Sequence, residues 1–255
     1  MGSHEPRPAQ GAEAAGRVAL SSRSRRIGAH TTARAAAQTP REGGLQVRFF
    51  ALGGLAGPVL FVSLIILCGA LRPGYSHVTQ FISELGETGG SHAALMNLLG
   101  FIPTGLLLAA FGVSLANRFP RTSPSLAAAI LIVAYGLGIT GAGLYSCDPG
   151  CPSQHLSFEG MMHRVVSISA FLAGILGIAL WGRCFRSLAT WRSLSRYSAV
   201  SSAMALVFLL LVGVTEQSRV LTGVWQRLSM VTMDLWCAIV GLRVFRSGAG
   251  GGRAT

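Results

Sequence analysis

The sequence contains no lysine, and its 255 residues include only nine acidic side chains against 21 arginines. Residues 1–45 contain no long apolar run, whereas a cleavable signal peptide needs an apolar core within about the first 15–30 residues. We therefore expect the first apolar segment, which begins near residue 49, to remain as an uncleaved anchor. Almost all apolar content lies in such long segments, so no second folded, soluble domain is expected.

Six long apolar segments occupy most of the chain. They lie at about 50–71, 93–116, 125–146, 162–182, 197–215 and 223–245. Each reaches the roughly 20 residues that a helix needs to cross a ~30 Å hydrocarbon layer. The sequence therefore predicts an all-α fold, an integral membrane bundle of six transmembrane helices. An even number of spans places both termini on one side of the membrane.

The arginines indicate which side that is. They concentrate before the first span, after the last one, and in the second and fourth loops, which hold Arg118, Arg121, Arg183, Arg186, Arg192 and Arg196. The positive-inside bias predicts that both termini are cytoplasmic and that the membrane is the cell membrane. A net charge of +12 is also typical of nucleic-acid binding, but topology and anionic inner-leaflet lipid explain it here, so no nucleic-acid partner is expected.

The two ends of the chain differ from the spans in composition. Residues 1–48 are rich in Ala, Gly, Ser, Arg and Pro, so they bury too little apolar area to offset the entropy of ordering. We interpret 1–48 as a disordered, Arg-rich cytoplasmic tail, 49–247 as the six-helix domain and 248–255 as a flexible tail. An Arg- and Ser-rich tail with few acids is also typical of an organellar transit peptide.

The glycines within the third span follow the spacing of a dinucleotide-binding fingerprint, from Gly136 through Gly138 to Gly141. That fingerprint requires a preceding strand and a helix that begins at the phosphate, whereas these residues lie inside an apolar span. Small residues in a span favour close approach of helices instead, and we expect Gly53 and Gly57 to allow it in the first span.

The first outer loop carries apolar residues at helical spacing. They are Val78, Phe81, Ile82 and Leu85. The spacing predicts a short amphipathic helix on the outer interface, with His77, Gln80 and Glu84 on its polar face. That polar face is either an ordinary solvated surface or part of a site.

The second outer loop contains Cys147 and Cys151 around a Pro-Gly turn, a pattern that predicts a local disulfide in an oxidising compartment. The alternative is a metal. Thiolates, imidazoles and carboxylates at these separations are zinc ligands, although paired CxxC spacing is absent. With the disulfide intact, Asp148, His155 and His163 remain candidate ligands for a divalent metal.

The sixth span carries polar side chains at its outer end and near its middle. Gln226 and Arg227 at its outer end are either headgroup contacts or donors to a phosphate or carboxylate. Asp234 lies near mid-span, where an ionisable group should face the bundle and have a partner or be protonated. This intramembrane acid either takes part in a proton relay or is neutral and forms a hydrogen bond between helices.

Several short motifs together resemble a bacterial family of six-span membrane proteins, catalogued as domain of unknown function number nine hundred and ninety-eight. The resemblance covers roughly residues 50–245. Its motifs are Gly74-Tyr75-Ser76, Ile82-Ser83-Glu84-Leu85-Gly86, Met96-Asn97, Cys147-Asp148-Pro149-Gly150-Cys151, His163, Trp225-Gln226-Arg227 and Trp236. The resemblance implies a fold and a membrane location, and brings no activity.

Because the Ser-Glu-Leu-Gly, Cys-Asp-Pro-Gly-Cys and Gln-Arg elements share the outer side, we hypothesise that they converge on one site. Its catalytic residues would be Glu84, Asp148 and His163, and its substrate-binding residues would be His77, Gln226 and Arg227. Two functions follow from this arrangement. The chain is either a non-catalytic membrane protein, such as a small transporter or partner subunit, or a membrane-embedded hydrolase or lipid- or isoprenoid-modifying enzyme. Its expected partners are the lipid bilayer and a lipid or amphiphilic small molecule.

Overall fold

The computed structural model describes residues 1–2 and 44–247, which include six helices long and apolar enough to cross a membrane. These spans are α2 (Leu45–Leu71), the continuous run of α3 (Ala93–Leu95), η2 (Met96–Phe101) and α4 (Ile102–Arg118), α5 (Ser123–Leu144), α6 (Phe158–Arg186), α7 (Ser193–Thr215) and α8 (Thr222–Ser247). Two short 3-10 helices, η1 (Ile82–Gly86) and η3 (Ala189–Trp191), lie in loops. The prediction of six spans is confirmed.

The predicted tails lie almost entirely outside the described residues. Their described part shows that α2 begins at Leu45, so residues 45–48, which we had assigned to the tail, are helical. Within 44–247 the chain forms helices and loops without a β-strand, in agreement with the all-α prediction.

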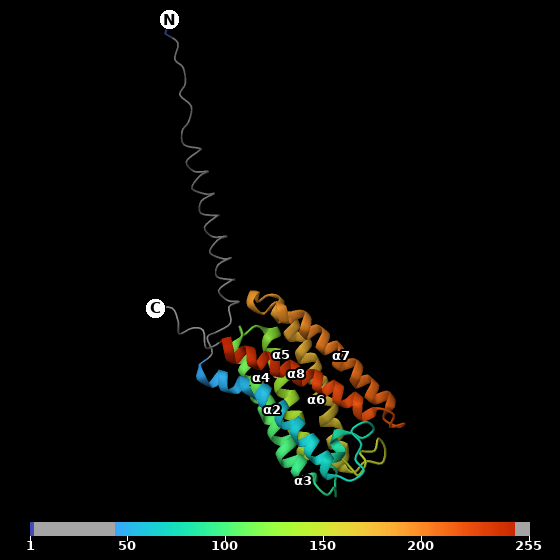
Figure 1. The fold of residues 1–255 in the computed structure, drawn as a ribbon. Coiled ribbons are helices and arrows are strands. Elements are labelled where there is room, and N and C mark those ends of the chain that lie inside the picture. Colours follow the sequence, from blue (N-terminus) through green and yellow to red (C-terminus); the bar gives the residue numbers. More distant parts are fainter. Residues whose placement is uncertain (3–43, 248–255) are drawn as a thin grey trace. The chain divides into compact units, whose positions relative to one another are not determined.

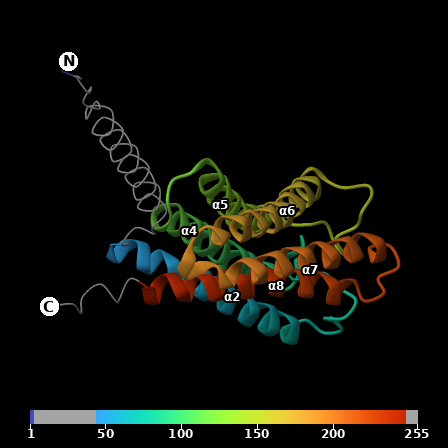
Figure 2. The same cartoon turned by 90° about the horizontal axis from the view of Figure 1, so that it is seen from above.

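The spans form a closed ring in chain order. Each one packs against the next along the chain, and α8 packs against both α7 and α2 (Figures 1 and 2). The connections 72–92, 145–157 and 216–221 meet at one end of this bundle, called here the three-loop end. The connections 119–122 and 187–192 lie at the opposite, two-loop end, where α2 begins and α8 ends.

Local signals explain where the helices begin. The Ser157 hydroxyl accepts a hydrogen bond from the Gly160 amide at 3.0 Å, which caps α6 and starts it four residues before the apolar run predicted at 162. Thr122 and Ser125 form a capping box at the start of α5, with proline in its first turn. Polar residues at these positions therefore lengthen the helices beyond their apolar segments.

Glycines allow two of the helices to touch backbone to backbone. A Cβ atom at Gly136 of α5 would lie 2.4 Å from the amide nitrogen of Ala109 and 2.5 Å from the carbonyl oxygen of Gly105 in α4. A Cβ at Gly105 would in turn lie 2.4 Å from the carbonyl oxygen of Gly136. Only glycine fits at this crossing, so Gly136 serves helix packing, as the sequence indicated.

Candidate functional site

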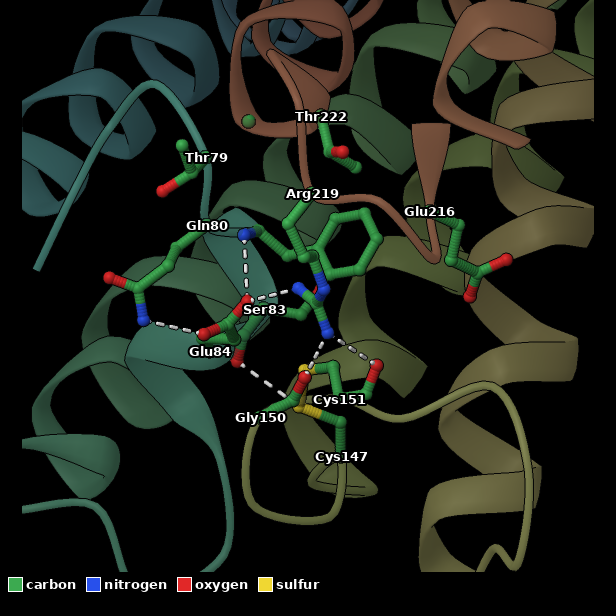
Figure 3. A network of polar contacts seen from close by, with 12 residues as sticks. Thr79, Gln80, Ser83, Glu84, Cys147, Gly150, Cys151, Glu216, Arg219 and Thr222 are labelled. Atoms are coloured by element: carbon green, nitrogen blue, oxygen red, sulfur yellow. Dashed lines mark hydrogen bonds and ion pairs between the residues drawn. A yellow bond between two sulfur atoms is a disulfide. The ribbon is translucent and has the colours of Figure 1, made fainter. Parts of the chain in front are cut away.

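Glu84 lies at the centre of a polar network at the three-loop end (Figure 3). Its side chain is buried, and its carboxylate accepts hydrogen bonds from Arg219 Nη1 at 2.7 Å, Gln80 Nε2 at 2.7 Å and the Phe81 amide at 3.0 Å. Both carboxylate oxygens therefore have donors inside the protein. The predicted amphipathic helix is not confirmed: the loop holds only the five-residue η1, and Glu84 points inward.

Arg219 joins all three loops of this end. Its Nη1 binds Glu84, and its Nη2 donates to the carbonyl oxygens of Gly150 and Cys151 (Figure 3). The guanidinium also lies 4.6 Å from the ring centroid of Phe81, within the range of a cation–π contact. The backbone of Arg219 has φ of +59°, a left-handed conformation that costs energy for a residue with a side chain.

A second ion pair ties the first loop to the cysteine loop. Arg72 Nη2 binds Glu87 Oε1 at 2.6 Å, and Glu87 Oε2 accepts from the Gly150 amide at 2.6 Å. Cys147 and Cys151 are joined by a disulfide that closes the turn around Gly150. The loops 72–92 and 145–157 are thus held together through Glu87 as well as through Arg219.

Both α8 residues predicted to bind substrate, Gln226 and Arg227, contact the first loop. Arg227 donates to the Tyr75 hydroxyl at 2.6 Å, to the Gln80 carbonyl at 2.9 Å and to His77 Nδ1 at 3.1 Å. Burial and the nearby positive charge of Arg227 lower the pKa of His77, which favours the neutral ring that accepts this bond. Burial raises the pKa of Tyr75, an effect that Arg227 partly opposes.

Asp148 lies apart from the Glu84 network, at the beginning of α6. Its carboxylate accepts from the Ser157 amide at 2.9 Å, and the hydrogen bonds from Ser157 lower the pKa of Asp148. His155 is exposed and adopts a left-handed backbone, with φ of +56°. Among residues 44–247, no three His, Cys, Asp or Glu side chains gather in a way that would hold a metal ion.

A cavity of about 270 Å³ opens beside the loop network, between α6, α7 and the start of α8. Its apolar lining includes Phe81, Leu156, Ile168, Phe171, Leu209 and Val212. Ile168 and Gly213 both line the cavity and are exposed, so it reaches the outer surface of the bundle between α6 and α7. Of the predicted site residues, His163 and Gln226 line this cavity, together with both cysteines.

The hydrogen bonds of His163, a lining residue of the cavity, define the tautomer of its neutral ring. Its Nδ1 lies 2.7 Å from the Tyr145 carbonyl oxygen and 3.1 Å from that of Ala142, and both partners are acceptors. Nδ1 must therefore carry the proton, and Nε2 of the neutral ring has a lone pair. In this tautomer Nε2 is the hydrogen-bond acceptor of the ring, and His163 is a lining residue of the cavity.

One ion pair supplies the charge at the cavity wall. Arg164 of α6 binds the Glu216 carboxylate with both terminal nitrogens, at 2.6 and 3.0 Å. The two side chains are 36% and 18% exposed, and both residues line the cavity. The bidentate geometry pairs the two charges with each other.

The intramembrane acid Asp234 is placed deep in the bundle, away from the lining of this cavity. It is buried on α8, and its Oδ1 accepts from the Tyr135 hydroxyl of α5 at 3.1 Å. Among the described residues, none offers a hydrogen bond to Oδ2. Asp234 thus has the interhelical partner that its depth requires, with Tyr135 as a residue that the sequence did not single out.

The predicted outer site is therefore divided into three parts. Glu84, His77 and Arg227 belong to the loop network, Asp148 belongs to the start of α6, and His163 with Gln226 belongs to the cavity. The cavity lining contains neither Glu84 nor Asp148. Sequence reasoning did not assign Arg72, Arg164 and Arg219 to the site, because their side chains bind Glu84, Glu216 and Glu84, which lie 12, 52 and 135 residues away in the chain.

Six long apolar helices, with a cavity at the three-loop end, define a multi-pass helical membrane protein. The chain belongs to the family described as "Protein of unknown function (DUF998)", whose model matches residues 55–243. No curated protein and no solved structure matches it. The family predicted from the sequence motifs is thus confirmed.

Proposed function

We propose that the chain is a non-catalytic membrane protein that holds an amphiphilic molecule in the cavity at the three-loop end, as a small transporter or a partner subunit. The observation that carries this proposal is the cavity itself, about 270 Å³ in volume and lined mainly by apolar side chains. Apolar pockets with a few polar groups are typical of small-molecule sites. Its opening between α6 and α7 would admit a ligand directly from the bilayer.

The positions of the acids support binding over catalysis. The Glu84 carboxylate is already bound by three donors, and Glu216 is paired with Arg164. General acid–base catalysis needs a proton-transferring group within hydrogen-bond reach of the reacting atoms. The alternative, a membrane-embedded hydrolase or lipid- or isoprenoid-modifying enzyme, would have to use His163 without a neighbouring catalytic carboxylate.

A photoreactive lipid tests the proposal. We expect a monoacylglycerol with a diazirine in its acyl chain, added to the full chain in nanodiscs, to label peptides that contain Ile168 or Leu209. In Gly213→Phe, labelling of both peptides should fall at least roughly tenfold, because the larger side chain fills the mouth of the cavity. A Cβ atom at Gly213 would meet nothing within 4 Å, so this variant has room to fold.

Two results would contradict the proposal. Equal labelling of the wild type and Gly213→Phe would show that the probe reaches these peptides only from the surrounding lipid. Recovery of a chemically changed probe after incubation with wild-type protein, and not with His163→Asn, would instead support the enzyme.

We further propose that the two-loop end faces the cytoplasm of a bacterial cell. Arginines gather at this end, and the acids of the loops lie at the other, which agrees with the positive-inside bias. Alkaline phosphatase fused after His155 should be active, because it would be exported, whereas fusion after Leu188 should be inactive. The opposite pattern would reverse the orientation and leave the cavity proposal unaffected.

A further inference from the structure

We propose that the ligand of the cavity is an uncharged lipid alcohol, a long apolar chain whose hydroxyl binds His163 and Gln226. This inference rests on the proposed function and names the class of molecule that the site takes. It follows from three properties of the cavity wall: its charge balance, its uncommitted hydrogen-bonding groups and its apolar surface.

The charge balance disfavours an ionic headgroup. Arg164 is the basic residue and Glu216 the acidic residue of the described lining, and they neutralise each other through two hydrogen bonds of 2.6 and 3.0 Å. A phosphate or carboxylate would have to displace Glu216 from Arg164, and an ammonium would have to displace Arg164 from Glu216. Either exchange breaks a bidentate, charge-assisted pair, so an uncharged head is favoured.

The hydrogen-bonding groups at the wall are complementary to a hydroxyl. His163 Nδ1 donates to two backbone carbonyls, which leaves Nε2 as an acceptor. Gln226 Oε1 accepts from the Ile82 amide at 2.7 Å, which fixes the side-chain amide and leaves its NH₂ group as a donor. Among the described residues, none forms a hydrogen bond with His163 Nε2 or Gln226 Nε2.

A hydroxyl can both donate to His163 and accept from Gln226, whereas an ether or an ester carbonyl can only accept. The rest of the ligand must be apolar, because Leu156, Phe171 and Val212 line the remaining wall. Burial of the apolar chain contributes affinity for any lipid of similar length. The hydrogen bonds of the hydroxyl make the site select an alcohol over lipids with other head groups.

Competition for labelling tests this assignment. The diazirine monoacylglycerol is bound to the full chain in nanodiscs and displaced by four unlabelled competitors that share one alkyl chain and end in a hydroxyl, a methyl ether, a carboxylate or a trimethylammonium group. In the wild type, the alcohol should halve labelling at roughly five- to tenfold lower concentration than the ether, which cannot donate to His163. The two ionic competitors should be no better than the ether.

His163→Asn is the matched variant. The asparagine amide can replace the Nδ1 donor toward the carbonyls of Ala142 and Tyr145, but it has no group in the place of Nε2. We expect this variant to remain folded and to bind the alcohol and the ether equally. A retained preference for the alcohol in His163→Asn would overturn the role of His163, and stronger competition by either ionic lipid would overturn the uncharged class.

Failure of the proposed function looks different from failure of this inference. If Gly213→Phe does not reduce labelling, the cavity is not a ligand site at all. If labelling depends on the cavity but the four competitors act alike, the cavity binds amphiphiles without reading a hydroxyl. Acylglycerol and isoprenoid alcohols share the proposed chemistry, and unlabelled monoacylglycerol and farnesol as further competitors distinguish these two sources.

Discussion

Replacement of Arg219 by methionine is expected to lower the free energy of unfolding by about 2–4 kcal/mol. Methionine keeps much of the apolar contact but removes the positive charge, which leaves the carboxylate of Glu84 buried without its counter-ion. Loss of one partner of a buried ion pair costs about 3–5 kcal/mol. We expect a smaller loss of unfolding free energy here, because the Arg219 side chain is 33% exposed. Unfolding in detergent micelles, followed by circular dichroism during SDS titration, measures the change.

The protein contains its own control for this experiment. Arg164 and Glu216 form a similar pair at the same end of the bundle, but their exposure is 36% and 18%, so Arg164→Met should cost at most about 1 kcal/mol. The double variant Glu84→Gln, Arg219→Met should recover most of the loss, because a neutral amide replaces the stranded charge. Equal effects of the two arginine substitutions would show that burial of Glu84 is not what makes Arg219 important.

Substitution of Gly136 by alanine is expected to destabilise the bundle by about 2–3 kcal/mol. The added methyl would lie 2.4 and 2.5 Å from backbone atoms of α4, which cannot rotate away as a side chain would. The two helices must therefore separate, and overpacking of this kind costs about 1–3 kcal/mol or more. The same titration with SDS measures the loss.

Gly213→Ala provides the comparison for Gly136. Both glycines lie within spanning helices, but a Cβ at Gly213 meets nothing within 4 Å. Alanine there should cause no loss of stability and up to about 1 kcal/mol of gain, since it restricts the unfolded chain. A similar loss at both positions would mean that glycine is needed for helix flexibility and not for the contact between α4 and α5.

The helices could be predicted because their signal is local. A run of about 20 apolar residues is sufficient to indicate a span, and each predicted run overlaps one of the six observed helices. The ends were less accurate, since caps such as Ser157 extend a helix into polar sequence that hydropathy assigns to a loop. The sequence also predicted that a helix packs closely against Gly136, but it did not identify Gly105 as the residue at that contact.

The pairing of the polar residues could not be predicted in the same way. Sidedness correctly grouped Glu84, Asp148, His163 and Arg227 at one end of the bundle. Which of them meet depends on loop conformations, such as the left-handed backbone of Arg219, a residue type that rarely adopts it. Arg219 binds Glu84 across 135 residues of sequence, and no local pattern encodes that distance.

The closed ring of helices also sets the order in which contacts can form during synthesis. Adjacent spans pack against each other, so most helix interfaces can assemble as each new span emerges, while α2 must wait for α8. Arg219, Gln226 and Arg227 lie in or next to that last span, and each of them binds the loop 72–92. The loop 72–92, although it is synthesised first at the three-loop end, is therefore the last to acquire all of its partners.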